Sequence, residues 1–224
     1  MNAIVTGANR GIGLELVRQL LARGVKVEAA CRCPNQAKEL CATGARVHEL
    51  DVASDASAAA FAHELDGMAI DLLINNAGVY GNARQRMADF DYATATRTFE
   101  INALGALRVS QALLPHLRRG VGKKIAHISS AMGSIGATTS PGDLAYRVSK
   151  AALNMVSRSI ALELRDDRII SLVVHPGWVR TDMGGPNAPT TAAESARGIL
   201  TQIDAANFHD SGQFVDFQGE RCGW

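Results

Sequence analysis

The chain has 224 residues, of which 47% are hydrophobic and 20% are charged, and its formal net charge at pH 7 is +1. This composition is typical of a globular protein with a full hydrophobic core, and the length fits one large domain or two small ones. The near-neutral charge disfavours a nucleic-acid partner, which requires clustered Lys and Arg. No apolar run reaches the roughly 18 residues of a membrane span, so we expect no membrane partner.

Two further features favour a cytoplasmic protein. The first strand-like run leads directly into Thr6-Gly7, without the charged leader and cleavage site of a secretory signal. The four cysteines lack accompanying residues at metal-ligand spacing, and a chain of this size does not need disulfides. We therefore interpret them as reduced thiols and expect no metal; they are Cys31, Cys33, Cys41 and Cys222.

Short apolar runs alternate along the chain with longer segments in which apolar residues recur every three or four positions. The short runs predict β-strands at residues 2–6, 25–30, 47–50, 70–75, 124–129, 169–175 and 213–217. The longer segments predict α-helices at residues 12–23, 56–65, 94–117, 145–164 and 192–203. Gly24 follows the first of these helices, where a C-terminal stop is expected.

Strands that alternate with helices predict right-handed crossovers and a parallel sheet covered on both faces. Most of the predicted strands are apolar at every position, which fits burial on both sides. Because no linker or repeat interrupts the series, we expect a single domain over residues 1–224. Its fold class is α/β, a doubly wound Rossmann-type sheet of about seven strands, with ligands bound outside the carboxyl ends of the strands.

The turn after the first predicted strand is rich in glycine: residues 6–13 are TGANRGIG, and a helix begins inside this run. Glycines at such a turn let the backbone approach a pyrophosphate, and the helix N-terminus offers free N–H groups to it. The alternative is a tight turn that only requires left-handed dihedral angles. The position between the first strand and the first helix favours phosphate binding. Nucleotide hydrolysis is disfavoured, since no Gly-Lys-Ser/Thr follows.

The spacing Gly-x-x-x-Gly-x-Gly resembles that of the short-chain dehydrogenase/reductase family. Further motifs of that family follow in its order at later strand ends: Asp51-Val52, Asn75-Asn76-Ala77-Gly78, Ser129-Ser130, Tyr146-x-x-x-Lys150 and Pro176-Gly177. Within the family, residues 175–179, residues 181–183 and the final Trp224 resemble the C-factor and Sniffer group of carbonyl reductases. The resemblance implies an NAD(P)-dependent oxidoreductase acting on a small-molecule carbonyl or alcohol, and a homodimer or homotetramer.

The end of the second predicted strand distinguishes NAD from NADP. NAD sites place an acidic residue about twenty positions after the glycines, but residues 29–32 contain none and end in Arg32. A guanidinium pairs with the oxygens of a 2′-phosphate, and Arg10 offers a second cation. The alternative for Arg32 is a solvated surface residue; we favour NADP (NADPH) over NAD. The implied cofactor-binding residues are Gly7, Asn9, Arg10, Gly11, Ile12, Gly13, Arg32, Asp51, Val52, Asn75, Ala77, Gly78, Tyr146, Lys150, Pro176, Gly177, Val179 and Thr181.

Tyr146 and Lys150 lie four residues apart in a predicted helix, so they share one face. A phenol with a pKa near 10 is a poor acid at neutral pH, and a nearby ammonium group is expected to lower that pKa. A Tyr-x-x-x-Lys pair by itself usually belongs to a protein surface. Its place after the fifth strand, in a chain that also carries the glycine turn, favours catalysis with Tyr146 as general acid or base. The resemblance implies that Lys150 also binds the nicotinamide ribose.

Two more residues complete the implied catalytic set of Asn102, Ser130, Tyr146 and Lys150. The Ser130 hydroxyl is expected to donate to the substrate carbonyl oxygen, with Ser129 and Ser134 as alternatives. Asn102 interrupts a helical segment, where Asn is unfavourable. It is either a polar residue on a helix flank or, as the resemblance implies, a kink that holds a water relaying protons to Lys150. Sixteen positions separate Ser130 from Tyr146, a few more than the family usually has, which predicts a longer loop at 138–142.

Two other functions stay open. The first is a cofactor-binding signalling or redox-sensing protein with little turnover, although such relatives typically lack the tyrosine or the lysine. The second is an oligomeric scaffold that uses helices 94–117 and 145–164. Of the remaining residues, His127 and His175 are interpreted as buried structural histidines rather than a paired site. Tyr80 either faces the substrate or packs in the core.

Overall fold

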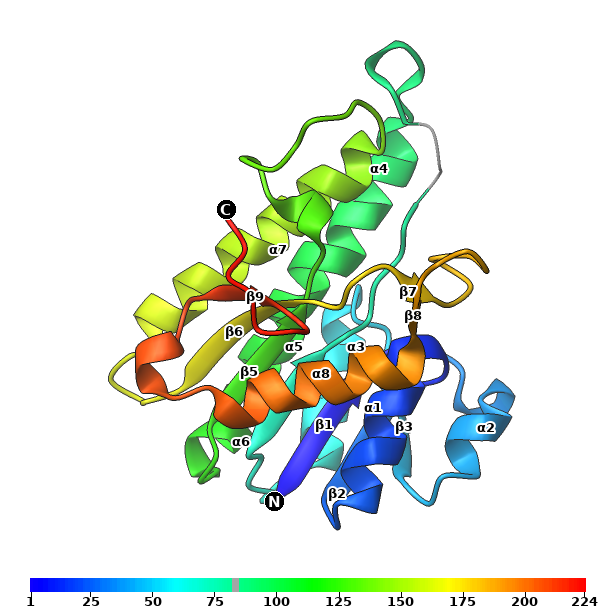
Figure 1. Cartoon of the computed structure of the whole chain (residues 1–224). Helices are drawn as coiled ribbons and strands as arrows, with labels where there is room; N and C mark the ends of the chain where they lie inside the picture. The colour runs from blue at the N-terminus through cyan, green and yellow to red at the C-terminus, as the bar shows by residue number, and fades with distance from the viewer. Residues whose placement is uncertain (82–84) are drawn as a thin grey trace.

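The computed structural model describes residues 1–81 and 85–224 (Figure 1). In this part of the chain the central sheet has seven strands, all parallel to their neighbours, in the order β3-β2-β1-β4-β5-β6-β9. The strands are β1 (Asn2–Thr6), β2 (Lys26–Cys31), β3 (Arg46–Glu49), β4 (Leu72–Asn75), β5 (Lys124–Ile128), β6 (Ile170–His175) and β9 (Phe214–Asp216). The strand order reverses between β1 and β4, so the doubly wound α/β prediction is confirmed.

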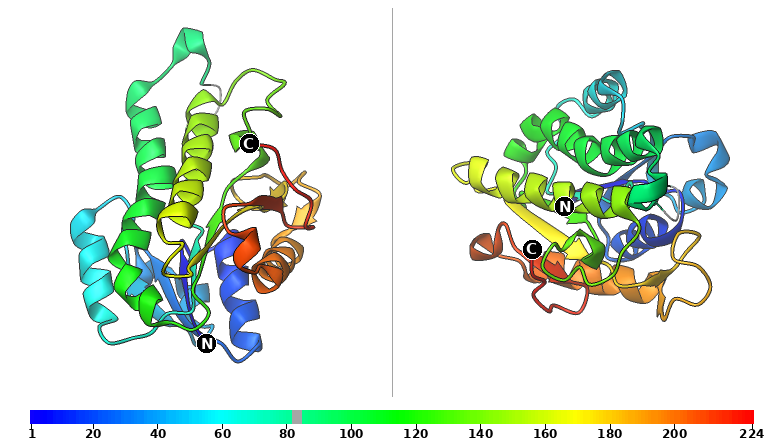
Figure 2. Two further views of the ribbon diagram at one scale, coloured as in Figure 1. Left: turned by 90° about the vertical axis from the view of Figure 1, so that its left-hand side faces the viewer. Right: turned by 90° about the horizontal axis from the view of Figure 1, so that it is seen from above.

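Helices cover both faces of this sheet (Figure 2). One face packs against α1 (Gly11–Ala22) and α8 (Ala192–Ala205), and the other against α3 (Asp55–Glu64), α5 (Gly105–Ala112), α6 (Leu114–Arg119) and α7 (Leu144–Glu163). Shorter elements connect them: α2 (Lys38–Cys41), α4 (Tyr92–Phe99), the 3₁₀ turns η1 (Pro34–Gln36), η2 (Met87–Asp89), η4 (Ala131–Gly133) and η5 (Phe208–Asp210), and a small parallel sheet of β7 (Val179–Arg180) with β8 (Thr190–Thr191).

The central strand β1 explains why the sequence is apolar at consecutive positions. Ala3 and Val5 belong to the hydrophobic core shared with α1 and α8, while Ile4 belongs to the core on the opposite face. All three are fully buried. Each large aliphatic side chain removed from water in this way contributes about 1.5–3 kcal/mol. Burial on two faces therefore selects apolar residues without the alternation of a half-exposed strand.

The prediction of one continuous helix at residues 94–117 is wrong. The segment is divided into α4, a π-helical turn η3 (Glu100–Leu104), α5 and α6. In the π turn the buried side chain of Asn102 bonds to the backbone of Val79 instead of lying on a helix flank. Pro115 lies in the first turn of α6, where its missing N–H costs no helical bond. Gly24, by contrast, ends α1 with a φ of 74°, as predicted.

Candidate active site

The glycine turn lies at the carboxyl end of β1, beside the end of β4, where the strand order reverses. Its position is fixed by Thr6 and Asn76. The Thr6 hydroxyl accepts from the backbone N–H groups of Asn76 and Ala77, both at 3.1 Å. The Asn76 amide nitrogen donates in return to the carbonyl oxygens of Thr6 at 2.9 Å and Gly7 at 3.1 Å. Asn76 therefore joins two segments that the sequence had marked separately as cofactor-binding.

Close packing explains the glycines in this turn. Gly7 has a φ of 62°, and a Cβ there would lie 2.7 Å from Ala77 Cα. A Cβ on Gly13 would lie 2.4 Å from the carbonyl oxygen of Gly7. Helix α1 starts immediately after the turn with no side-chain cap and no acidic residue in its first turn. The N–H groups at Gly11, Ile12 and Gly13 thus form a donor set that suits a pyrophosphate.

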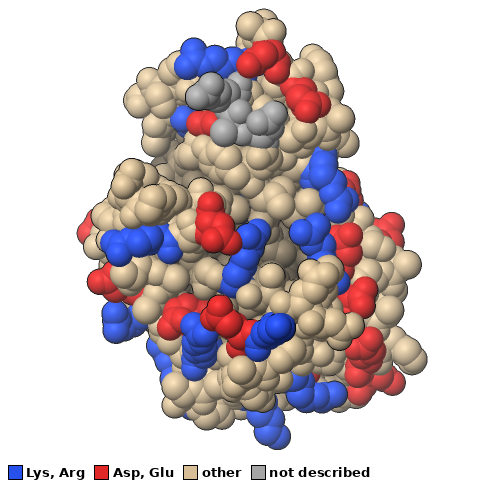
Figure 3. All heavy atoms as spheres, turned by 90° about the vertical axis from the view of Figure 1, so that its right-hand side faces the viewer, with Lys and Arg blue, Asp and Glu red and all other residues tan. Residues whose placement is uncertain are grey.

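The adenosine end of the candidate site contains the predicted arginines. Arg32 is exposed directly after β2 and is in no ion pair within residues 1–81 and 85–224. Arg10 is also exposed, but its guanidinium lies 2.7 Å from the carboxylate of Asp182, in the segment after β7. Figure 3 shows positive and negative side chains interspersed over this side of the molecule, with basic groups on both sides of a central hollow.

Two other predicted cofactor-binding residues follow β3. Asp51 is half-buried and accepts from the backbone N–H of Ala53 at 3.0 Å, and its carboxylate lies 3.6 Å from the Arg97 guanidinium. Val52 is buried against α5, where a Cβ on Gly105 would lie 2.8 Å from its side chain. Both residues are thus fixed by contacts within the fold.

The segment after β6 lies against the glycine turn. A Cβ on Gly11 would lie 3.2 Å from the methyl carbon of Thr181, and Val179 is buried in β7. The Pro176 carbonyl accepts from the Ser195 hydroxyl of α8 at 2.7 Å, and Gly177 has a φ of 84°. The predicted residues of the sixth strand end therefore reach the phosphate-binding turn.

Tyr146 and Lys150 are both buried on α7, with the Lys150 Nζ atom 5.7 Å from the centroid of the Tyr146 ring. Lys150 Nζ donates to the carbonyl oxygen of Ile128 at 2.9 Å. Gly78 leaves space beside this amine, since a Cβ there would lie 3.6 Å from Nζ and 3.2 Å from Asn102 Oδ1. The Asn75 side chain, also buried, donates to Ser110 at 3.0 Å, while its Oδ1 atom has no partner in the part of the chain described.

Ser130 is the serine whose hydroxyl lies near enough to Tyr146 to lower the pKa of the phenol. The two alternatives have other partners: Ser129 donates to Asn154 at 2.6 Å, and Ser134 accepts from the backbone of Ala137 at 3.2 Å. The turn η4 that begins after Ser130 packs directly on α7. A Cβ on Gly133 would lie 2.8 Å from the carbonyl carbon of Lys150, so only glycine permits this approach.

A chain of hydrogen bonds links the π turn to Tyr146. Asn102 Oδ1 accepts from the Val79 N–H, and its Nδ2 donates to the Val79 carbonyl, both at 2.8 Å. The same Nδ2 donates to the Ser149 hydroxyl at 2.9 Å, and Ser149 donates to the Tyr146 carbonyl at 2.7 Å. Ser149 was not among the site residues predicted from the sequence. Its place inside the Tyr-x-x-x-Lys motif marked the position, but nothing in the sequence marked its partner.

Burial dominates the electrostatics of this cluster. It raises the pKa of Tyr146 to about 12, with a smaller contribution from Tyr80 and partial compensation by the Ser130 hydrogen bond. Burial also lowers the pKa of Lys150 to about 8. The net shift of the Tyr146 pKa is therefore opposite in direction to the lowering expected from Lys150, because burial outweighs the contacts that favour the phenolate.

The two histidines at neighbouring strand ends differ in burial, since His127 is fully buried and His175 is partly buried. His127 is fully buried, and burial lowers its pKa to about 3, with Lys150 adding to this effect. Burial also lowers the pKa of His175. Both are therefore neutral at pH 7. No group of three or more His, Cys, Asp or Glu within the described ranges could hold a metal ion. Among the helices that the structure describes, none is long and apolar enough to cross a membrane.

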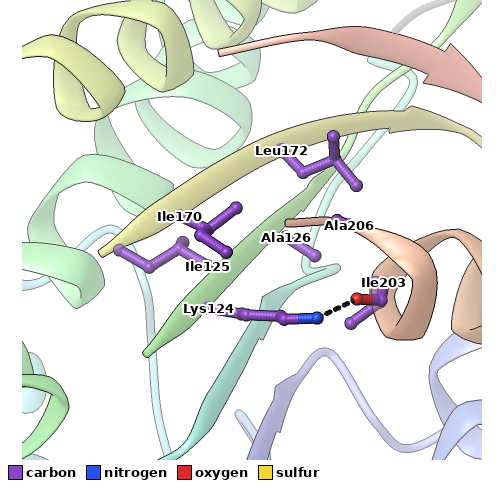
Figure 4. Close-up of a pocket in the computed structure, with 7 residues that line it drawn as sticks. All are labelled: Lys124, Ile125, Ala126, Ile170, Leu172, Ile203 and Ala206. Atoms are coloured by element: carbon purple, nitrogen blue, oxygen red, sulfur yellow. Dashed lines mark hydrogen bonds between the residues drawn. The ribbon is translucent and has the colours of Figure 1, made fainter. Parts of the chain in front are cut away.

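A small apolar pocket at the opposite edge of the sheet is distinct from this site (Figure 4). It lies where β5 and β6 begin, between them and the end of α8. Its lysine, Lys124, donates across it to the carbonyl oxygen of Ile203 at 2.6 Å. Because ligands of doubly wound sheets bind at the carboxyl ends of the strands, this pocket is part of the core packing.

Comparisons with known proteins agree with this geometry. The family model for the short chain dehydrogenase matches residues 1–192. The C-signal protein of Myxococcus xanthus is 50% identical over 165 residues, which are 74% of this chain and 99% of that protein. The carbonyl reductase Sniffer of D. melanogaster superposes with a TM-score of 0.94 at 31% identity, covering 100% of this chain and 99% of that one. The NADPH-bound carbonyl reductase from chicken fatty liver superposes with a TM-score of 0.91 at 34% identity, covering 100% and 98%.

Proposed function

The chain belongs to the short-chain dehydrogenase/reductase family of oxidoreductases, and we propose that it is a cytoplasmic NADPH-dependent carbonyl reductase with Tyr146 as its proton donor. The observation that carries this proposal is the convergence of four side chains outside the carboxyl ends of the strands. The Ser130 hydroxyl lowers the pKa of Tyr146, Lys150 lies beside the Tyr146 ring, and Ser149 joins the Tyr146 carbonyl to Asn102. In this arrangement the Tyr146 phenol is the acid, Ser130 is the hydrogen-bond donor, and Lys150 is the cation beside the phenol.

The side chains divide the work of reducing a carbonyl as follows. Ser130 donates a hydrogen bond to the carbonyl oxygen, and Tyr146 transfers its proton to that oxygen as negative charge develops there. Lys150, when protonated, stabilises the phenolate that remains. Asn102 holds the water that relays a proton toward Lys150, because its Oδ1, which accepts one bond from Val79, keeps a second lone pair free. The nicotinamide ring, when bound, supplies the hydride.

The glycine turn and its surroundings fit the dinucleotide. The uncapped start of α1 would bind the pyrophosphate, Asp51 and Val52 the adenine, and Lys150 the nicotinamide ribose. The preference for NADPH rests on Arg32, which is exposed after β2 where NAD sites have a carboxylate. The NADPH bound to the carbonyl reductase from chicken fatty liver supports this choice.

A cofactor titration tests the preference. Arg32→Ala should weaken NADPH binding at least about tenfold while leaving NADH binding within about twofold, because only NADPH carries the 2′-phosphate. Arg165→Ala is the matched control, since Arg165 is exposed in the turn that leads from α7 into the amino end of β6. Equal losses for both nucleotides would refute the assignment of Arg32.

The reaction is tested by NADPH oxidation with a panel of aldehydes, ketones and quinones. We expect turnover of at least one class. Tight NADPH binding by fluorescence, without turnover of any compound in the panel, would instead favour the cofactor-binding signalling protein that the sequence left open.

We also propose that the enzyme forms a homodimer or homotetramer through α7. Val148, Met155 and Leu162 recur every seven residues on this helix and are 52%, 65% and 60% exposed. Residues seven apart lie on one face of a helix, so they form an apolar stripe that a second copy would cover. Light scattering should report an oligomer that Met155→Glu dissociates; a monomeric native chain would refute this.

A further inference from the structure

Tyr80 lies directly on the catalytic phenol. The ring centroids of Tyr80 and Tyr146 are 4.6 Å apart, with an angle of 36° between the planes. The two rings come from different elements, since Tyr80 is in the segment after β4 and Tyr146 is in α7. An aromatic pair at this separation contributes beyond simple burial and constrains the orientation of both rings.

The segment that carries Tyr80 is fixed on both sides. The preceding Val79 has both backbone polar groups bonded to Asn102. The following Gly81 has a φ of 77°, and a Cβ there would lie 2.6 Å from the Thr98 hydroxyl of α4. Tyr80 therefore cannot move away from Tyr146 without breaking the bonds of Asn102 or the contact with α4.

Asp143, which immediately precedes α7, lies near the Tyr80 hydroxyl, and its carboxylate raises the pKa of that phenol. Asp143 has a φ of 54°, a left-handed conformation that Asp adopts more readily than most residues. The backbone of Tyr80 is thus fixed beside Asn102, while its hydroxyl lies near a carboxylate.

We propose that Tyr80 is a positioning residue of the reductase site: its ring covers one face of the Tyr146 phenol, excludes water from it and fixes its orientation. The inference rests on the proposed function, because it assigns Tyr80 a role toward the proposed proton donor. The Asp143 carboxylate further favours the neutral form of the Tyr80 phenol, whereas the charged neighbour of Tyr146 is Lys150.

The charged groups around the two phenols are consistent with this division. Burial raises the pKa of Tyr80, and the Asp143 carboxylate raises it further, while Arg147 opposes this. Lys150 Nζ lies 5.7 Å from the centroid of the Tyr146 ring, and the Ser130 hydroxyl lowers the pKa of this phenol. The cation is therefore beside the phenol that must ionise, and the anion is beside the phenol that must not.

The first test needs neither cofactor nor substrate. The chain has three tyrosines, so a Tyr92→Phe background leaves only the stacked pair for spectrophotometric titration. Adding Tyr80→Ala removes the cover, and the pKa of Tyr146 should then fall from about 12 toward its ordinary value of 10. The phenolate fraction is compared at the highest pH at which circular dichroism reports the native fold. An unchanged titration of Tyr146 would overturn the proposal.

The second test is kinetic and separates the effect of the Tyr80 ring from the effects of its hydroxyl and of the Asp143 charge. Tyr80→Ala should lower kcat at least about tenfold with little change in KM for NADPH, and its activity should be lost at a lower pH. Tyr80→Phe keeps the ring, and Asp143→Asn keeps the acceptor and the left-handed backbone, so both should stay within about threefold of the native kcat. Phe90→Ala is the control, because Phe90 stacks on Tyr92 outside the site.

The outcomes distinguish this inference from the proposed function. Native kcat and pH profile in Tyr80→Ala would overturn the role of Tyr80 while the reductase activity stands. If the native chain turns over no carbonyl, the proposed function fails, and the phenol titration alone still supports or overturns the contact between Tyr80 and Tyr146. A folded Tyr80→Phe that loses activity as severely as Tyr80→Ala would also contradict a role based on the ring.

Discussion

Two lysines, one at each edge of the sheet, have similar surroundings and opposite consequences. Lys124 begins β5 at the amino edge, and its Nζ donates to the carbonyl oxygens of Ile203 at 2.6 Å and Asp204 at 3.2 Å (Figure 4). Lys150 lies at the carboxyl edge, and its Nζ donates to the Ile128 carbonyl at 2.9 Å. Burial lowers the pKa of both amines.

The difference lies in what compensates each charge. Lys124 lies at the C-terminal end of α8, where the helix dipole is negative, and the carboxylates of Asp204 and Asp210 oppose the lowering of its pKa. Lys150 is more deeply buried, and no carboxylate opposes the lowering of its pKa to about 8. Its neighbour is instead the Tyr146 phenol. Lys124, whose charge is compensated by carboxylates, stabilises the fold. Lys150 has no such carboxylate, so its charge is available to stabilise a phenolate at Tyr146.

The largest effect is expected at the phenol of the carboxyl edge. Tyr146→Phe removes the proton donor without changing the ring, so turnover should fall by about 10³-fold or more, while the Kd for NADPH stays within about twofold. NADPH oxidation and cofactor fluorescence measure the two quantities. Tyr92→Phe, at an exposed position on α4, should leave both unchanged. Normal turnover in Tyr146→Phe would remove the chemical distinction between the two edges.

The lysines themselves provide the next comparison. Lys150→Met should lower turnover by about 10²-fold, since the phenolate loses its cation. Lys124→Met should keep turnover and instead lower the free energy of unfolding by about 1 kcal/mol, because the last carbonyls of α8 lose their donor. Urea unfolding and NADPH oxidation are measured on both variants. A Lys124→Met enzyme as inactive as Lys150→Met would break the comparison.

Two asparagines extend the comparison between the carboxyl and amino edges of the sheet, with a smaller expected effect on turnover. Asn102→Ala leaves the Val79 N–H and carbonyl groups without partners, which should cost about 1–3 kcal/mol of stability and lower turnover about tenfold. Asn2 donates to the Ala69 carbonyl at 2.8 Å at the amino edge. Asn2→Ala should therefore lower stability alone, as measured by the same two assays. Full activity in a folded Asn102→Ala would show that the π turn does not serve the site.

The last comparison is the pH dependence of stability, measured in the absence of cofactor, which the charge of Lys150 is expected to control. Lys150 is protonated in the unfolded chain up to its ordinary pKa of 10.5 but loses its proton near pH 8 in the folded chain. The unfolded state binds more protons in this interval. The contribution of Lys150 to the free energy of unfolding therefore rises with pH from about 8 to 10.5. Tyr146 acts oppositely above its ordinary pKa of 10. Urea midpoints should thus rise between pH 8 and 10, and Lys150→Met should flatten the rise.

Sequence patterns predicted the elements that depend on local burial. β1 was predicted with its observed limits, because its three central residues alternate between two apolar cores. The glycine turn was recognisable because its spacing reflects close backbone packing. The π turn was not, since it depends on a tertiary contact between Asn102 and Val79 that are 23 residues apart. β7 and β8 have two residues each, too few for any periodicity.

The site residues show the same limit. Residue types and spacing predicted Tyr146, Lys150 and Ser130, but not the direction in which burial moves the pKa of the phenol. The pairing of Arg10 with Asp182 was equally invisible, because it joins segments 172 residues apart. The chemical role of a single residue can be predicted from its type and spacing. The pKa shifts and ion pairs that its neighbours produce can be predicted only from their positions in space.

The close packing of Gly133 against the backbone of Lys150 has a consequence for how related enzymes can differ in sequence. Because η4 and α7 touch main chain to main chain, the separation of the serine from the tyrosine is set by that contact and not by the loop between them. Residues 138–142 can therefore lengthen, shorten or change composition while the reacting groups keep their places. Related enzymes can therefore differ in the substrates they accept through changes in this loop, provided that position 133 remains glycine.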